Sequence, residues 1–107
     1  MYKIVKIDEK DMELTANAAT PFRFKQLFQK DLMQILGNEE RAMAEADQVI
    51  AELAYVMSKQ AEKADMNKLN MDEFLTWLEG FSALAFVNAS EEILSVYMDS
   101  SISSSTP

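Results

Sequence analysis

Neither cysteine nor histidine occurs in this chain of 107 residues. Without cysteine no disulfide can form, and nothing points to an oxidising compartment. The absence of both residue types also removes the Ser-His and Cys-His nucleophiles and the usual ligands of zinc. Glycine occurs only twice, too rarely for a glycine-rich loop that cradles phosphate. These absences predict a protein that is not an enzyme and that uses no metal or cofactor.

Long apolar stretches are missing as well. The longest uncharged run inside the chain, residues 80–90, is far shorter than the ~20 residues that a membrane helix needs. Lysine and acidic residues interrupt the first 20 residues, so no signal peptide is expected. The composition, 49% hydrophobic and 26% charged, is that of a globular protein. We expect one cytosolic domain, because a chain of this length is too short for two cores.

Charge is unevenly distributed over the sequence. Residues 1–30 hold six cations and four anions, a net of +2, and residues 31–107 hold four cations and fourteen anions, a net of -10. An acidic surface repels phosphate, which disfavours nucleic acid as a partner. This asymmetry has two interpretations: a solvated acidic surface that keeps the protein in solution, or a basic N-terminal part that docks on an acidic surface of the same molecule, of a second copy or of another partner.

Local patterns predict a mainly α fold: one small domain over residues 1–99 and a flexible, disordered Ser-rich tail over residues 100–107. Strand-forming and alternating side chains near the N-terminus predict a short strand or hairpin. Apolar residues at helical spacing then predict about four helices. The expected strands cover residues 2–8 and 12–15. The first two expected helices cover residues 20–36 and 39–63, and the last two begin at residues 70 and 88.

Capping residues locate the ends of these helices. Thr20 is the expected N-cap of the first helix, Pro21 its first residue and Gly37 its left-handed stop. Asn70 and Asn88 are each followed three residues later by Glu, the form of a capping box, and therefore mark the starts of the last two helices.

Spacing along the helices separates core from surface. Phe24 and Phe28 are one turn apart and belong to the core, whereas Phe22 is expected at the surface. The other expected core residues are Met43, Ala46, Val49, Ile50, Leu53, Val56, Met57, Ala61, Phe74, Trp77, Leu78, Phe81, Ile93, Leu94 and Tyr97.

One segment has the beginning of a calcium loop. Asp65 and Asn67 occupy the first and third positions of an EF-hand pattern. The fifth position of the loop, which should supply a ligand, is Leu69. The sixth is Asn70 where the pattern has glycine, and the twelfth is Thr76 where it has the bidentate glutamate. Too few oxygen ligands remain to hold Ca²⁺, so we interpret the segment as a turn and a helix cap.

Eight methionines in a chain of this length are unusual. Methionine fills irregular gaps in cores, and it also suits surfaces that adapt to a partner. Met12, Met66, Met71 and Met98 lie at the edges of the expected elements and are the better surface candidates.

A longer pattern spans residues 13–32, ELTANAATPFRFKQLFQKDL, where small residues precede Thr-Pro-x-Arg-aromatic-Lys and an acidic-Leu pair. In this pattern the chain resembles the tail assembly chaperones of long-tailed phages and prophages of Gram-positive bacteria. Residues 52–57, 74–78 and 92–94 are similar to the middle and end of such proteins, and the likeness covers about residues 12–98. Gln29 stands where the family pattern has Gly. The matching positions are Thr20, Pro21, Arg23, Phe24, Lys25, Phe28, Asp31 and Leu32.

The resemblance implies a non-catalytic assembly factor, similar to the short product of a tail-assembly gene pair. Such chaperones coat the aggregation-prone tape measure protein in the host bacterial cytoplasm and are absent from the mature virion. A longer product made by frameshifting usually adds a part that binds the tail tube protein. We therefore expect the tape measure protein as partner, with homo-oligomers compatible with the charge asymmetry, and neither nucleic acid nor membrane as partner.

We expect client binding or self-association to involve Phe22, Arg23 and Lys25, together with the surface candidates Met12, Met66, Met71 and Met98. Two other functions remain open at this point. An acidic regulatory protein or nucleic-acid mimic would bind a basic host protein through carboxylates spaced as phosphates on one face. A small helical transcription regulator would need a basic recognition helix, for which only residues 23–30 qualify.

Overall fold

The computed structural model describes residues 1–102, with side chains described through Asp99. Within this range the chain is mainly helical and begins with a two-stranded hairpin, as the sequence predicts. The elements are β1 (Tyr2–Ile7), β2 (Lys10–Thr15), α1 (Thr20–Phe28), α2 (Leu32–Leu36), α3 (Glu39–Ala61), the 3-10 helix η1 (Met66–Lys68), α4 (Met71–Leu78), α5 (Ala85–Asn88) and α6 (Ser90–Ile102).

The hairpin is antiparallel, with Tyr2 opposite Thr15 and Ile7 opposite Lys10. Its turn is made by Asp8 and Glu9, whose φ angles of 56° and 67° belong to the left-handed region. Positive φ at both central residues gives a two-residue turn the twist that paired strands prefer. The apolar face, made of Val5, Ile7, Leu14 and Ala16, is buried. Packing of β2 on α3 covers this face, as a lone hairpin requires for stability.

The first predicted helix is divided in two, which corrects the sequence interpretation. Gln29 ends α1 in a left-handed conformation with φ of 59°. Asp31 then begins α2, its carboxylate accepting the N–H of Gln34 at 3.2 Å. Gly37, the predicted left-handed stop, instead has φ of -81° and lies in the right-handed region. The left-handed residue therefore falls at Gln29, eight positions earlier than predicted.

Thr20 does not cap α1 as predicted, because it is the first residue of the helix and is fully buried. Its hydroxyl accepts the backbone N–H of Asn17 at 3.0 Å and the side-chain amide of Gln60 at 2.9 Å. The same amide donates to the carbonyl of Thr15 at 2.7 Å. Thr20 therefore ties the hairpin, α1 and the end of α3 together.

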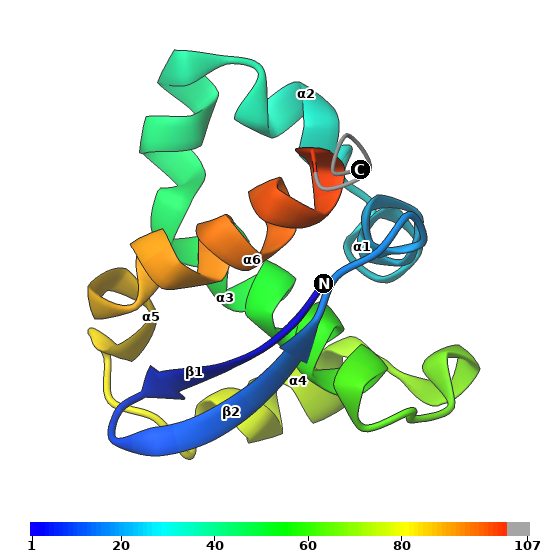
Figure 1. Ribbon diagram of the computed structural model, residues 1–107, viewed down its shortest axis with the longest axis vertical. Coiled ribbons are helices and arrows are strands. Elements are labelled where there is room, and N and C mark those ends of the chain that lie inside the picture. The colour runs from blue at the N-terminus through cyan, green and yellow to red at the C-terminus, as the bar shows by residue number, and fades with distance from the viewer. Residues whose placement is uncertain (103–107) are drawn as a thin grey trace.

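Helix α3 is the centre of the molecule, in contact with β2, α1, α2, α4, α5 and α6. Every residue from Val49 to Ser58 is buried. Figure 1 shows the hairpin against its C-terminal half, with α2 towards one end of the molecule and α4 towards the other. The predicted core position of Met43 is wrong: this residue, near the N-terminal end of α3, is exposed.

The C-terminal part follows the prediction at one cap and departs from it at the other. Asn70 caps α4 as predicted, by accepting the N–H of Glu73 at 2.9 Å, and α4 ends at Leu78. Asn88 is not a helix start, because it is the last residue of the short helix α5. Helix α6 continues to Ile102, past the predicted start of the tail. The rest of the predicted tail, residues 103–107, lies outside the described residues.

Candidate functional site

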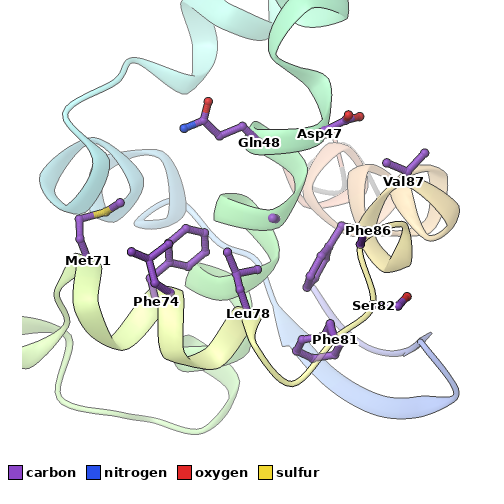
Figure 2. Close-up of a pocket in the computed structure, with 12 residues that line it drawn as sticks. Asp47, Gln48, Met71, Phe74, Leu78, Phe81, Ser82, Phe86 and Val87 are labelled. Atoms are coloured by element: carbon purple, nitrogen blue, oxygen red, sulfur yellow. The ribbon is translucent and has the colours of Figure 1, made fainter.

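An open apolar groove lies between α3, α4 and α5 and encloses about 450 Å³. Figure 2 shows Met71, Phe74 and Leu78 along α4 on one side, with Phe86 and Val87 of α5 on the other. Helix α3 closes one end with Asp47, Gln48 and Ala51; Leu75 of α4 and three residues of the α4–α5 loop, Phe81, Ser82 and Ala83, complete the lining. We call this the α3–α4–α5 groove.

Large side chains of the groove remain open to solvent. Met71, Leu75 and Val87 are 44%, 51% and 39% exposed. Asp47 is the only charged group in the lining, and it forms no ion pair with any described residue. The groove therefore combines uncovered apolar area with one carboxylate at its edge.

Aromatic rings form a connected cluster beneath the groove. Phe74 packs edge-on against Tyr55 with ring centroids 5.1 Å apart, and Trp77 contacts Phe81 and Phe86 at 5.0 and 5.4 Å. Edge and offset contacts at such distances are favourable arrangements of aromatic side chains. These ring contacts at the base of the groove pack α4 against α3 and α5.

The tip of the hairpin holds the α4–α5 loop. The Asp8 carboxylate accepts the backbone N–H of Ser82 at 2.9 Å and its hydroxyl at 3.0 Å. The Lys10 ammonium donates to the carbonyl of Gly80 and lies 4.7 Å from the centre of the Phe81 ring. These contacts fix the loop that separates the two walls of the groove.

The residues predicted from sequence to bind a partner do not form one surface. Arg23 and Met66 line the same small cavity of about 100 Å³ between α1 and η1, and Met71 belongs to the groove. Phe22 is 76% exposed and Lys25 is exposed on α1. The remaining two, Met12 on β2 and Met98 on α6, line neither of these cavities.

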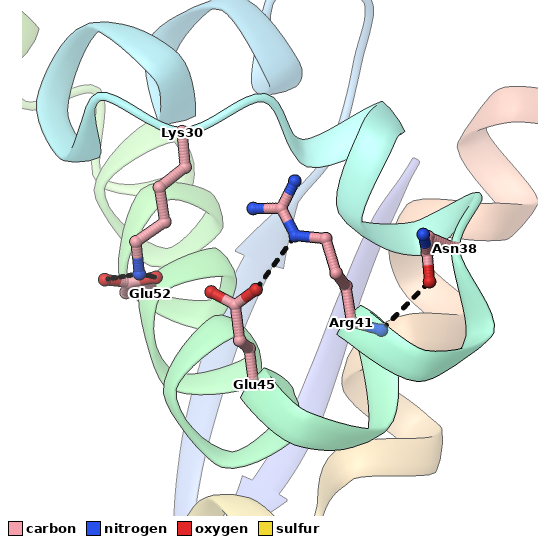
Figure 3. Close-up of polar contacts among 5 residues, drawn as sticks. All are labelled: Lys30, Asn38, Arg41, Glu45 and Glu52. Carbon is pink, nitrogen blue, oxygen red and sulfur yellow. Dashed lines mark hydrogen bonds and ion pairs between the residues drawn. The ribbon is translucent and has the colours of Figure 1, made fainter.

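A buried ion pair, which the sequence reading did not single out, joins the α1–α2 connection to α3. Lys30 lies 3.0 and 3.1 Å from the two carboxylate oxygens of Glu52 (Figure 3). Glu52 is 1% exposed and Lys30 is 23% exposed. Burial raises the pKa of the Glu52 carboxyl, and the ion pair with Lys30 counteracts part of that rise.

Tyr55 carries a second buried polar group. Its hydroxyl has no hydrogen-bond partner among the described residues. Burial, followed by the charges of Glu73 and Glu62, raises the pKa of Tyr55. Within residues 1–99 no group of three or more carboxylates has the arrangement of a metal site.

Comparison of the chain with models of known families, with curated proteins and with solved structures found no match. Over residues 1–102, no helix combines the length and the apolar character needed to cross a membrane.

Proposed function

We propose that this chain is a non-catalytic tail assembly chaperone of a long-tailed phage or prophage, which binds the tape measure protein and keeps it soluble during tail assembly. The observation that carries the proposal is the apolar surface left open on an acidic molecule. Eleven large hydrophobic side chains are exposed among the described residues, while the formal net charge is -8. Three of these side chains, Met71, Leu75 and Val87, share the α3–α4–α5 groove, and contiguous open apolar area of this kind marks interaction sites. A charged surface keeps a coated apolar partner in solution.

The likeness in residues 13–32 supports the same function. Phe24, Phe28 and Leu32 of that pattern are buried and hold α1 and α2 against the rest of the molecule. Phe22 and Lys25 point away from the core and remain available to a partner. The pattern therefore contains residues for folding and residues for binding. Under this proposal the protein acts in the host cytoplasm, leaves before the virion is complete, and has a longer frameshifted form that contacts the tail tube protein.

Two contacts weigh against the transcription regulator that the sequence leaves open. The basic stretch of α1 would have to serve as its recognition helix, yet Lys30 is engaged by the buried carboxylate of Glu52. Arg23 is half-buried beside η1. Among the described residues of that stretch, Lys25 is the one exposed cation, which is too little positive charge for a phosphate backbone.

The acidic regulatory protein differs from the chaperone in the force that holds its partner. Binding of a basic host protein through carboxylates weakens steeply as salt screens the charges. Binding of an apolar client survives added salt, because burial of apolar area supplies most of its free energy. Salt dependence of the complex therefore separates the two functions.

Co-expression with a tape measure protein tests the proposal. We expect the tape measure protein to aggregate when expressed alone, and to stay in the supernatant and co-purify when this chain is present, including in ~0.5 M salt, where the Debye length falls well below ~10 Å. A tape measure protein that remains in the pellet would contradict the proposed function. So would turnover of a substrate, or binding of duplex DNA at physiological salt, by the purified chain.

A further inference from the structure

We infer that the α3–α4–α5 groove is the docking site for an amphipathic helix of another protein, whose apolar stripe is flanked by Lys or Arg. The inference rests on the proposed function in one respect only, the identity of the partner as a helical client. The shape, charge and anchoring of the groove carry the rest.

The shape fits a helix better than an extended peptide. Met71, Leu75 and Leu78 are spaced i, i+4 and i+7 on α4 and therefore form one ridge along that helix. Phe86 and Val87 of α5 form the opposite wall. A partner helix laid between the walls packs its own apolar ridge against that of α4, as helices do in globular proteins.

The charge favours a basic partner. Asp47 is the charged residue of the lining and forms no ion pair with any described residue. Residues 71–88, which build both walls, contain three carboxylates (Asp72, Glu73 and Glu79) and no Lys or Arg. Asp72 and Glu73 lie along another pocket of α4 beside Lys59, and Lys10 covers Phe81 at the loop, so the carboxylate that lines the groove itself is Asp47. Lys or Arg beside the apolar stripe of a docked helix would pair with Asp47, whereas Asp or Glu there would be repelled.

The walls are held in place before a partner arrives. The Asp8 carboxylate fixes Ser82 through two hydrogen bonds, and Lys10 bonds to Gly80 and covers Phe81. These bonds hold Gly80 and Ser82 of the loop and reduce the ordering that binding requires, which favours affinity.

A second copy of this chain fits the groove less well. The basic helix α1 offers one exposed anchor, Phe22, while its other aromatic residues, Phe24 and Phe28, are buried in its own core. One side chain does not form a stripe at i, i+3, i+4 and i+7. Helix α4 of a second copy does carry an apolar ridge, but residues 71–88 around it contain carboxylates and no Lys or Arg. The occupant that matches both the ridge of α4 and the charge of Asp47 is therefore a different protein, with a continuous apolar face flanked by cations.

Two synthetic peptides test the inference directly. Each has about 20 residues, enough for ~30 Å of helix. Leu occupies the positions i, i+3, i+4 and i+7 of the apolar stripe, and all remaining positions are Lys in one peptide and Glu in the other. Anisotropy of a labelled peptide measures affinity, and the emission of Trp77, which contacts Phe81 and Phe86, reports occupancy. We expect the Lys peptide to bind at least about tenfold more tightly than the Glu peptide, a difference of ~1.4 kcal/mol.

Paired variants separate the groove from general surface attraction. Leu75→Gln alters the ridge of α4, and Ile4→Gln makes the same kind of change on β1 at nearly equal exposure, 51% against 53%. We expect Leu75→Gln to lower the affinity for the Lys peptide by about tenfold and Ile4→Gln to leave that affinity unchanged. Asp47→Lys should reduce the preference for the Lys peptide, whereas Glu92→Lys, outside the groove lining, should preserve it.

Equal binding of the two peptides, absence of binding, or equal loss in Leu75→Gln and Ile4→Gln would overturn the inference. It would also fall if Leu75→Gln converted an oligomer into a monomer by light scattering, because a second copy would then occupy the groove. Co-expression distinguishes this failure from failure of the proposed function. If Leu75→Gln solubilises the tape measure protein as well as the unaltered chain does, the groove is not the client site but the chaperone function stands; if the unaltered chain fails, the function falls.

Discussion

Replacement of Lys30 by Met should destabilise the fold in a pH-dependent way. Glu52 is 1% exposed, and both of its carboxylate oxygens lie within 3.1 Å of the Lys30 ammonium. Removing one partner of a fully buried ion pair costs about 3–5 kcal/mol. Because Lys30 retains 23% exposure, we discount that figure and expect a loss of about 2–3 kcal/mol in the free energy of unfolding at neutral pH.

The sign of the pH dependence follows from the raised pKa of Glu52. The native state holds the proton of this carboxyl more tightly than the unfolded state does, so the contribution of Glu52 to stability falls as pH rises above the ordinary value of 4.5. Without Lys30 the native pKa rises further, which extends the loss to higher pH. The difference between the variant and the unaltered chain should therefore be small near pH 4.5 and largest at alkaline pH.

Urea denaturation near pH 4.5 and at alkaline pH measures the difference in free energy of unfolding between Lys30→Met and the unaltered chain. A thermal midpoint lowered by about 4–8 °C per kcal/mol should accompany the loss. Lys30→Met/Glu52→Leu is the matched control, because an apolar pair of similar volume leaves no buried charge unpaired and should recover most of the stability. A cost for Lys30→Met that is the same at both pH values, or a double variant as unstable as the single one, would refute the reasoning.

Three further changes test other parts of the structure. Gln29→Gly should raise the free energy of unfolding by about 0.5–1 kcal/mol, since glycine adopts the left-handed conformation without strain; unchanged or lower stability in urea would contradict it. Tyr55→Phe should be stabilising by about 1 kcal/mol, because it removes a buried hydroxyl without a partner, and a loss of stability would mean that the hydroxyl is bonded. Charge reversal at Arg23 and Lys25 should weaken co-purification with the tape measure protein or self-association; if both are unchanged, the predicted role of these cations is wrong.

The hairpin and the helices could be predicted because their signals are local. The alternation in residues 2–15 and the Asn70 cap depend on neighbours a few positions away. The role of Thr20 could not be predicted in the same way, because its hydroxyl is bonded by Gln60, forty residues later. The break at Gln29 was missed because glutamine is not the residue that usually ends a helix in a left-handed conformation.

The groove and the buried ion pair were missed for a different reason. Apolar residues at helical spacing predict burial, but they do not say whether anything in the same chain covers them. A signal was present in α4: Met71, Leu75 and Leu78 add a second apolar ridge to that of Phe74 and Trp77, more than a small domain can cover. Glu52 likewise sits inside the buried run from Val49 to Ser58, where a charge requires a partner from elsewhere in the chain.

Helix α3 contributes mainly to the stability of the fold, whereas the exposed ridge of α4 is available for binding. Every residue of α3 from Val49 to Ser58 is buried, whereas α4 buries Phe74 alone. Substitutions on the exposed ridge of α4 should therefore cost little folding free energy, because exposed side chains contribute little to the core. The Lys30–Glu52 pair and Leu75 share no contact among the interactions described, so their effects on stability should add. A loss of peptide binding in Leu75→Gln without a loss of stability would accordingly report on the groove itself and not on the fold that supports it.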